Sequence, residues 1–203
     1  MKSRYSISAI SFLVVISAVI AIYVYHEKQD SPVLTQRNSK TGRTEQSFRE
    51  MGFIRMDPVA GPLDILLQGL DGGSVNLSQF KGKIVFLNFW TTWCQSCREE
   101  VPSMSKLYDK LKDSDFAMVA VNLREQASVV EKFVHEFKVS FTVLLDLDGK
   151  AKSLFGVGTI PTTFILDKEG RIIGSAIGAR EWDSKKSFTL FQHLIDEGAV
   201  PTP

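Results

Sequence analysis

Residues 86–97 have the sequence FLNFWTTWCQSC, in which an apolar run leads directly into two cysteines separated by two residues. The apolar part predicts a strand that is buried on both faces, and residues 98–101 after the second cysteine are good helix formers. Cys94 is therefore expected at or near the amino end of a helix, where free backbone N–H groups and the helix dipole favour a thiolate. Cys97 lies one turn further in and is placed to attack a mixed disulfide made by Cys94. The stretch predicts a redox-active pair, with Cys94 as the nucleophile and Cys97 as the resolving cysteine.

Other uses of a cysteine pair fit the sequence less well. A structural zinc site needs four ligands, usually from a second cysteine pair or closely spaced histidines, and this chain has two cysteines and three scattered histidines (His26, His135 and His193). A structural disulfide across so short a loop would restrict the unfolded chain little. We therefore expect no bound metal and no cofactor.

The composition excludes some classes of function. The chain has 203 residues, enough for one domain with appendages, and its 24 basic and 23 acidic residues give a net charge of +1. These charges are interspersed, whereas a nucleic-acid surface would show clustered Lys and Arg. The composition therefore argues against a nucleic-acid-binding protein.

The N-terminal part has the character of a membrane anchor. Residues 7–25 carry no charge and are long enough to cross a bilayer core. Lys2 and Arg4 precede them, which predicts that residues 1–6 stay in the cytoplasm. A cleaved signal peptide is the alternative, and in either case the rest of the chain is exported. We expect a single-pass protein of the cytoplasmic (inner) membrane with its catalytic domain on the extracytoplasmic, periplasmic side.

The remaining chain is predicted to comprise a polar stalk at residues 26–56, in which an amphipathic contact at 48–54 is left open, and an α/β domain at residues 57–203. Ser128 is expected to open a helix, and Asp183 or Ser184 to cap the last one. Expected strands lie at 63–67, 75–77, 84–90, 116–121, 141–145, 163–166 and 171–177. Helices are expected after Cys94, with apolar residues at helical spacing as far as Leu111, then at 128–137, around 150–155, and from the cap at Asp183 or Ser184 to Gly198. This order predicts a mixed sheet, parallel at its centre, between helices.

Three motifs resemble those of the thioredoxin fold. The stretch from Trp93 to Cys97 is similar to the W-C-x-x-C active site, and Pro102 stands where that family has a proline inside the active-site helix. Residues 160–163 (IPTT) resemble the loop whose cis-proline faces the dithiol. Across residues 57–198 the resemblance narrows to membrane-anchored proteins of the TlpA/ResA kind, with a leading β-hairpin and an extra helix between central strands.

This resemblance implies an exported thiol-disulfide oxidoreductase that reduces client proteins, such as the haem-site cysteines of apocytochrome c. It also implies a transmembrane electron donor as a partner. Clients that assemble copper sites are an alternative, as is a metal-carrying or peroxidase-like protein of the same fold. The dipeptide Gln95-Ser96 between the cysteines differs from many relatives, which have a proline there, and it leaves the direction of electron flow open.

The resemblance also suggests further site residues. Glu125, after the strand ending near Val121, is the candidate for an acidic group that carries the proton of Cys97, with a solvated loop residue as the alternative. Glu100 matches an acidic position in the active-site helix, although simple solvation explains it equally well. Trp93, Ile160 and Pro161 are expected to bind the client, which would pair with the backbone beside a cis-Pro161.

Overall fold

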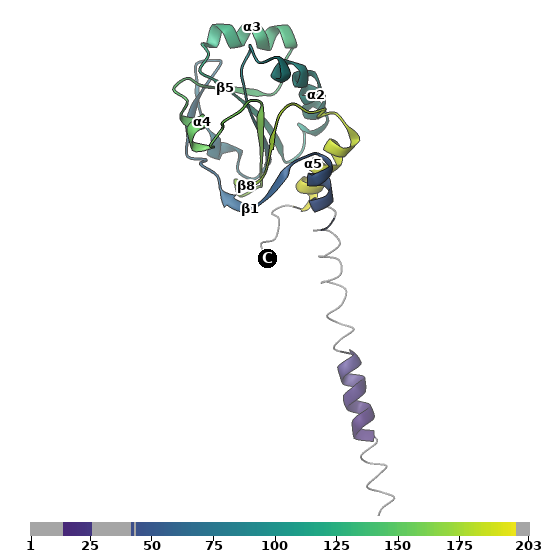
Figure 1. The fold of residues 1–203 in the computed structure, drawn as a ribbon. Coiled ribbons are helices and arrows are strands. Elements are labelled where there is room, and N and C mark those ends of the chain that lie inside the picture. The colour runs from purple at the N-terminus through teal and green to yellow at the C-terminus, as the bar shows by residue number, and fades with distance from the viewer. Residues whose placement is uncertain (1–13, 26–41, 43, 198–203) are drawn as a thin grey trace, which may run out of the picture. The chain divides into compact units, whose positions relative to one another are not determined.

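The computed structural model describes residues 14–25, 42 and 44–197, which fall into two compact units divided after Arg43 (Figure 1). Residues 14–25 are helical. Across the described ranges, no helix is both long enough and apolar enough to cross a membrane. Residues 1–13, and residues 26–41 and 43 of the predicted stalk, lie outside the described residues, so the anchor stays a prediction.

The second unit is one eight-stranded mixed sheet between helices. Its strands are β1 (Ile54–Ala60), β2 (Leu66–Gly69), β3 (Ser74–Asn76), β4 (Ile84–Trp90), β5 (Phe116–Leu123), β6 (Thr142–Asp146), β7 (Thr162–Leu166) and β8 (Arg171–Ile177), in the spatial order β1-β8-β7-β4-β5-β6-β2-β3. Its helices are α2 (Gln95–Leu111), α3 (Ala127–Phe137), α4 (Lys150–Leu154) and α5 (Lys185–Glu197), with a 3₁₀ turn at Leu77–Phe80, and residues 44–50 are also helical. This arrangement confirms the predicted mixed α/β sheet with a parallel centre.

The parallel centre consists of β4, β5 and β6, joined by the crossover helices α2 and α3. The outer strands all pair antiparallel, and short hairpin turns join β2 to β3 and β7 to β8. Since β4 lies between β5 and β7, all seven of its residues are buried. The carboxyl end of this central strand leads directly into the cysteine pair.

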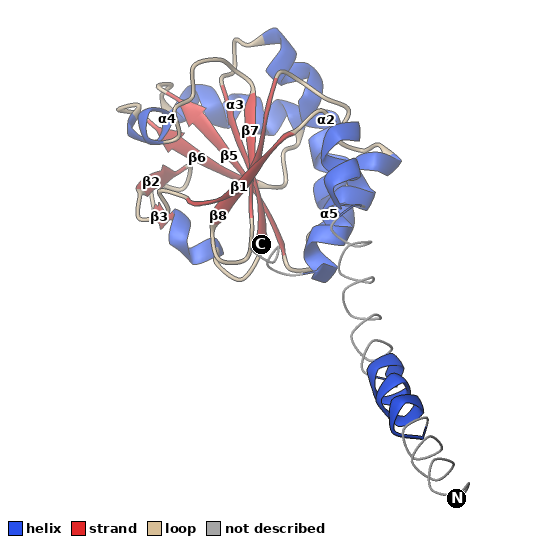
Figure 2. Ribbon diagram, turned by 60° about the horizontal axis from the view of Figure 1, so that its bottom comes forward, coloured by secondary structure: helices blue, strands red, loops and turns tan. Residues whose placement is uncertain are grey.

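Side chains of β4 alternate between two hydrophobic cores. Phe86 and Trp90 face a core built with α2, α3 and α5, whereas Leu87 and Phe89 face a second core that includes α4 and the region around β2. Figure 2 shows α2 and α5 on one side of the sheet and α4 on the other. Helix α2, which begins at the cysteine pair, therefore packs on the face of the sheet that α3 and α5 also cover.

The predicted boundary at residue 57 is wrong, because the domain begins near Thr44. Phe48, Met51 and Phe53 are buried in the α2/α5 core, and β1 extends the sheet by pairing with β8. The surrounding residues are polar, so their composition resembles a stalk. Their three apolar side chains are nevertheless enough to hold the segment against the sheet.

Helix caps were predicted with mixed success. The Ser184 hydroxyl accepts a hydrogen bond from the Ser187 N–H (3.2 Å), as expected of an N-cap of α5. The prediction for Ser128 is wrong, since α3 already begins at Ala127 with Gln126 as its N-cap. The predicted end of α5 at Gly198 lies just outside the described residues.

Candidate active site

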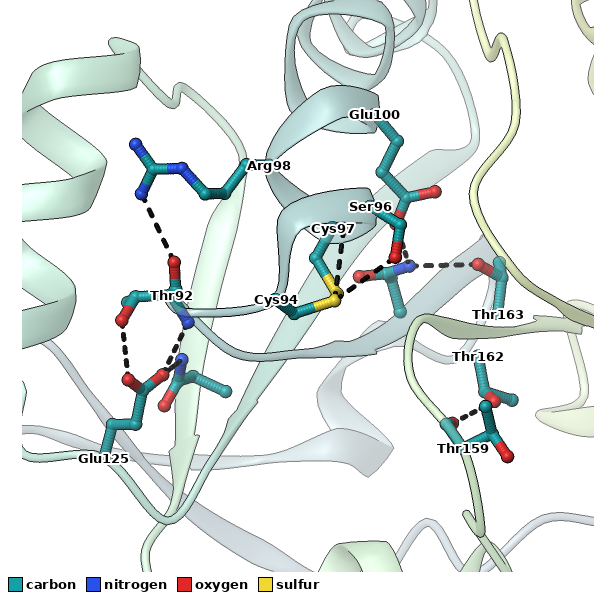
Figure 3. The surroundings of a disulfide bond; sticks show 12 residues. Thr92, Cys94, Ser96, Cys97, Arg98, Glu100, Glu125, Thr159, Thr162 and Thr163 are labelled. Carbon is teal, nitrogen blue, oxygen red and sulfur yellow. Dashed lines mark hydrogen bonds between the residues drawn. A yellow bond between two sulfur atoms is a disulfide. The ribbon is translucent and has the colours of Figure 1, made fainter.

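Cys94 and Cys97 form a disulfide at the start of α2, with 5.2 Å between their Cα atoms (Figure 3). Cys94 is the N-cap of the helix, and its Sγ accepts a hydrogen bond from the Cys97 N–H at 3.2 Å. The Ser96 hydroxyl lies 3.4 Å from the same sulfur. Cys94 is 7% exposed and Cys97 1% exposed. Cys94 is therefore the more exposed of the two cysteines, and donors of the first helical turn point at its sulfur, as the sequence predicted.

The loop before Cys94 is fixed by two charged side chains. The carboxylate of Glu125 accepts hydrogen bonds from the Thr92 N–H (2.7 Å), the Thr92 hydroxyl (2.6 Å) and the Asn122 amide (2.6 Å). Arg98 donates to the Thr92 carbonyl oxygen (3.3 Å) and also pairs with Glu136. These contacts give Glu125 a role in holding the loop, and no hydrogen bond within residues 44–197 joins it to either cysteine. Its predicted use as a proton carrier stays a prediction.

A second acidic side chain, Glu100, lies one helical turn after Cys97 and is 2% exposed. Its carboxyl group accepts hydrogen bonds from the Trp182 indole (2.9 Å) and from the Asn88 amide (3.0 Å). The Asn88 amide also donates to the Thr163 hydroxyl of the neighbouring strand β7 (3.0 Å). In Figure 3, Glu100 and Glu125 lie on opposite sides of the disulfide. The dithiol therefore has an acidic group on each side, one of them buried.

Burial raises the pKa of Glu100 from its ordinary 4.5 to about 7. Removing a carboxylate from water disfavours its charged form, and this effect outweighs the opposing hydrogen bonds from Trp182 and Asn88 and the positive charge of Arg180. A carboxyl group with a pKa near neutrality exchanges a proton readily at that pH. Glu100 is accordingly suited to accept and return a proton beside the cysteines.

The exposed side of the disulfide carries the predicted client-binding residues. Trp93 is 73% exposed, and it lines a groove of about 340 Å³ together with Ile160, Arg124 and Lys152. The Ile160–Pro161 peptide bond is cis, and Pro161 itself is buried. Figure 3 draws Thr159 and Thr162, on either side of that bond, among the surroundings of the disulfide. No hydrogen bond within the described domain uses the backbone N–H or C=O of Ile160, so these groups are free to pair with an extended peptide.

The structure therefore brings Trp93, the residue before Cys94, into one groove with Ile160, and adds Glu100, for which the sequence left solvation open. The sequence signal for Glu100 as a site residue was its position three residues after the second cysteine. Its burial depends on Trp182, a contact that no local pattern reveals. Among the described residues, no group of three or more His, Cys, Asp or Glu side chains is arranged to hold a metal ion.

The chain is similar in sequence to a known protein family and to several relatives named thiol-disulfide oxidoreductase. Residues 62–175 match the AhpC/TSA family. The chain is 37% identical over 115 residues to the thiol-disulfide oxidoreductase ResA of Bacillus anthracis, which covers 57% of this chain and 66% of that protein. It is equally similar to ResA of Bacillus subtilis strain 168, covering 57% of this chain and 64% of the relative. The match thus spans slightly less than two thirds of these relatives.

Solved structures give a similar result. StoA from Bacillus subtilis superimposes with a TM-score of 0.54 at 33% identity, covering 62% of this chain and 95% of that one. A secreted thiol-disulfide isomerase from Corynebacterium glutamicum superimposes with a TM-score of 0.63 at 26% identity, covering 71% of this chain and 92% of the other. The two solved proteins are thus matched over nearly their whole lengths.

Proposed function

This chain belongs to the AhpC/TSA family, and on that premise we propose that it is a thiol-disulfide oxidoreductase that reduces disulfides in exported client proteins. The observation that carries the proposal is the disulfide at the amino end of α2, whose outer sulfur lies next to the exposed Trp93. The similarity to relatives named thiol-disulfide oxidoreductase supports the same chemistry.

The reaction begins with the reduced pair. The Cys94 thiolate attacks one sulfur of the client disulfide, so that a mixed disulfide forms and the first client sulfur leaves as a thiolate, which takes up a proton. Cys97 then loses its proton and attacks the Cys94 sulfur. The second client thiol is released, and the Cys94–Cys97 disulfide is formed. Two electrons and two protons have passed to the client, and a reductant must restore the pair.

The residues around the pair serve the two steps differently. The Cys97 N–H and the Ser96 hydroxyl face the Cys94 sulfur and stabilise its thiolate. Glu100, one turn beyond Cys97, accepts the proton that Cys97 must lose before it attacks. Glu125 holds Thr92 and with it the approach to Cys94.

The client is bound in the groove beside Trp93. An extended segment on either side of its cysteine pairs with the free backbone groups of Ile160, while Trp93 covers its apolar side chains. This contact recognises backbone more than sequence and therefore suits a range of unfolded clients.

We further propose that the domain is held by the anchor at residues 7–25 on the extracytoplasmic face of the cytoplasmic membrane, with a transmembrane electron donor as its reductant. The haem-site cysteines of apocytochrome c are the proposed client. A protein that assembles copper sites, whose cysteines must also stay reduced, is the alternative, and the chemistry at Cys94 is the same for both.

A trapping experiment tests the proposal. In Cys97→Ala the mixed disulfide cannot be resolved, so Cys94 should retain its client covalently, and mass spectrometry of the adducts identifies that client. Cys94→Ala, which leaves the inner cysteine alone, is the matched control and should trap little. Absence of any Cys94-linked adduct with an exported protein would refute the function, and a set of adducts without apocytochrome c would refute the proposed client alone.

A further inference from the structure

The buried Glu100 is held from a part of the chain that takes no direct part in the exchange, namely the loop between β8 and α5. Trp182 of this loop donates its indole N–H to the Glu100 carboxyl group and its backbone N–H to the Ser103 hydroxyl (3.1 Å). That hydroxyl in turn donates to the Glu100 backbone carbonyl (2.8 Å). The position of the loop therefore decides the surroundings of the carboxyl group.

The loop is fixed by the guanidinium group of Arg180. Its donors bind four backbone carbonyl oxygens: those of Met51 (2.8 Å), Gly52 (2.9 Å), Ile177 (3.0 Å) and Gly178 (2.6 Å). We call these four hydrogen bonds the Arg180 bridge. It joins the segment before β1 to the end of β8, across 128 and 129 positions of sequence. Only a planar group with several fixed donors serves so many acceptors at once.

The segment before β1 is built to receive this guanidinium. Gly52 has a φ of +66°, and a Cβ atom there would lie 3.3 Å from Nη2 of Arg180. Phe53, the next residue, lies under the guanidinium at 5.8 Å and packs against the Trp182 ring at 5.9 Å. The segment thus contacts both Arg180 and the tryptophan that binds Glu100.

Arg180 also acts on Glu100 through its charge. Within the described residues, Arg180 forms no ion pair with a carboxylate within 4 Å, and all four acceptors of the Arg180 bridge are neutral carbonyl oxygens. Arg180 and Glu100 line the same cleft, of about 370 Å³, and the positive charge favours the carboxylate form of Glu100. The charge therefore opposes the effect of burial.

The other groups around Glu100 carry less weight. Lys106 in the same cleft is paired with Asp183 at 2.9 Å, which neutralises both. Strands β4 and β7 contribute the uncharged Asn88 and Thr163. The remaining charged groups lining the cleft are the acidic Glu99 and Glu181.

We propose that Arg180 is a positioning residue for the proton acceptor Glu100: the Arg180 bridge holds the β8–α5 loop and Trp182 against the carboxyl group, and ties that arrangement to the segment at residues 44–53. This part of the predicted stalk thereby helps to set the pH at which Cys97 is activated. The consequence for Cys97 depends on the proposed function, whereas the effect on Glu100 does not.

The test follows the titration of Glu100 in the oxidised full-length protein, in which the cysteines do not titrate. The protein is labelled with ¹³C at the glutamate carboxyl carbon, and Glu100→Gln identifies the signal. Arg180→Gln should raise the midpoint by a few tenths of a pH unit up to about one unit, because a nearby positive charge is lost. Arg180→Lys keeps the charge but cannot form the whole bridge, and its midpoint should lie between those of the wild type and Arg180→Gln.

Lys106→Ala is the matched control, since it removes a cation from the same cleft without touching the bridge, and its midpoint should move less than that of Arg180→Gln. The proposal would be overturned if Arg180→Gln left the midpoint of Glu100 unchanged. It would also be overturned if Lys106→Ala moved that midpoint as far as Arg180→Gln does. Should Arg180→Gln not fold, Arg180→Lys decides: a midpoint above those of the wild type and Lys106→Ala supports the proposal, and an equal one overturns it. A wild-type protein that exchanges no disulfides would refute the function and leave this titration readable.

Discussion

The indole N–H of Trp182 donates a hydrogen bond of 2.9 Å to Oε2 of Glu100, although the two residues lie 82 positions apart in the chain. Both side chains are buried, and the Trp182 ring packs edge-on against Phe86 of the central strand at 4.7 Å. This pair joins helix α2 to the loop between β8 and α5.

Trp182→Phe keeps an aromatic ring but removes the donor to Glu100. Since that bond favours the charged carboxylate, its loss should raise the midpoint of Glu100, which the ¹³C titration measures. The free energy of unfolding should fall by about 1–3 kcal/mol, because a buried acceptor loses its partner. Trp90→Phe is the control, since Trp90 is also buried and its indole N–H has no partner in the described structure. Equal midpoints in the two variants would contradict the assignment.

Glu100→Gln should remove a pH dependence of stability. The folded-state pKa of about 7 lies above the ordinary 4.5, so the folded protein binds this proton more tightly than the unfolded chain. The stabilising contribution is complete below about pH 4.5 and is lost as the pH rises through about 7. A pKa raised from 4.5 to about 7 corresponds to about 3 kcal/mol, as an upper bound.

Urea unfolding at pH 5 and pH 8 measures this effect as the difference between wild type and Glu100→Gln. The exposed neighbour Glu99 provides the control, since Glu99→Gln should leave the pH dependence as in the wild type. A wild type and a Glu100→Gln variant that lose stability in parallel between the two pH values would show that the carboxyl group is not perturbed.

Thr92→Val removes the hydroxyl that donates to Glu125 at 2.6 Å, while the backbone hydrogen bond to the same carboxylate is retained. We expect a loss of about 1–2 kcal/mol in the free energy of unfolding and slower exchange with a protein client, because the loop before Cys94 is less firmly held. Combined with Glu125→Gln, the two losses should be less than additive, since they remove the same contact. Additive losses would mean that the two residues act independently.

The same Glu125→Gln variant separates the two roles of Glu125. If Glu125 only holds the loop, the variant lowers the exchange rate at every pH. If it carries a proton, as the resemblance predicted, the shape of the pH–rate profile changes as well. Stopped-flow measurement of Trp fluorescence during exchange distinguishes the two outcomes.

Phe48→Ala tests whether the domain begins before residue 57. Phe48 is fully buried, and a Cβ atom on Gly174 of β8 would lie 2.4 Å from its ring, so the two are closely packed. The variant should lose about 3–5 kcal/mol in the free energy of unfolding. Ile54→Ala, at a side chain of the same region that is 68% exposed, should change it by less than about 0.5 kcal/mol. If the Phe48→Ala protein is as stable as wild type, residues 44–53 do not belong to the folded domain.

The sequence alone was sufficient for the features that are local. The run at residues 84–90 had to be buried on both faces, since it has no polar side of its own, and β4 is the central strand. The C-x-x-C spacing before a helix-forming stretch placed Cys94 as the N-cap with the less exposed Cys97 one turn further in. Helix and strand periods are set by neighbours within a few residues, which is why they could be predicted.

The tertiary structure alone decided which acidic side chain is buried beside the cysteines and where the domain begins. No local pattern around Glu100 predicts its burial, and its pKa is raised because the folded protein removes the carboxyl group from water. Residues 44–53 are mostly polar, and they are held by the close contact of Phe48 with Gly174 of β8 and by the hydrogen bonds from Arg180, more than a hundred positions later. Burial and long-range hydrogen bonds depend on chain segments that only folding brings together, so no local pattern contains them.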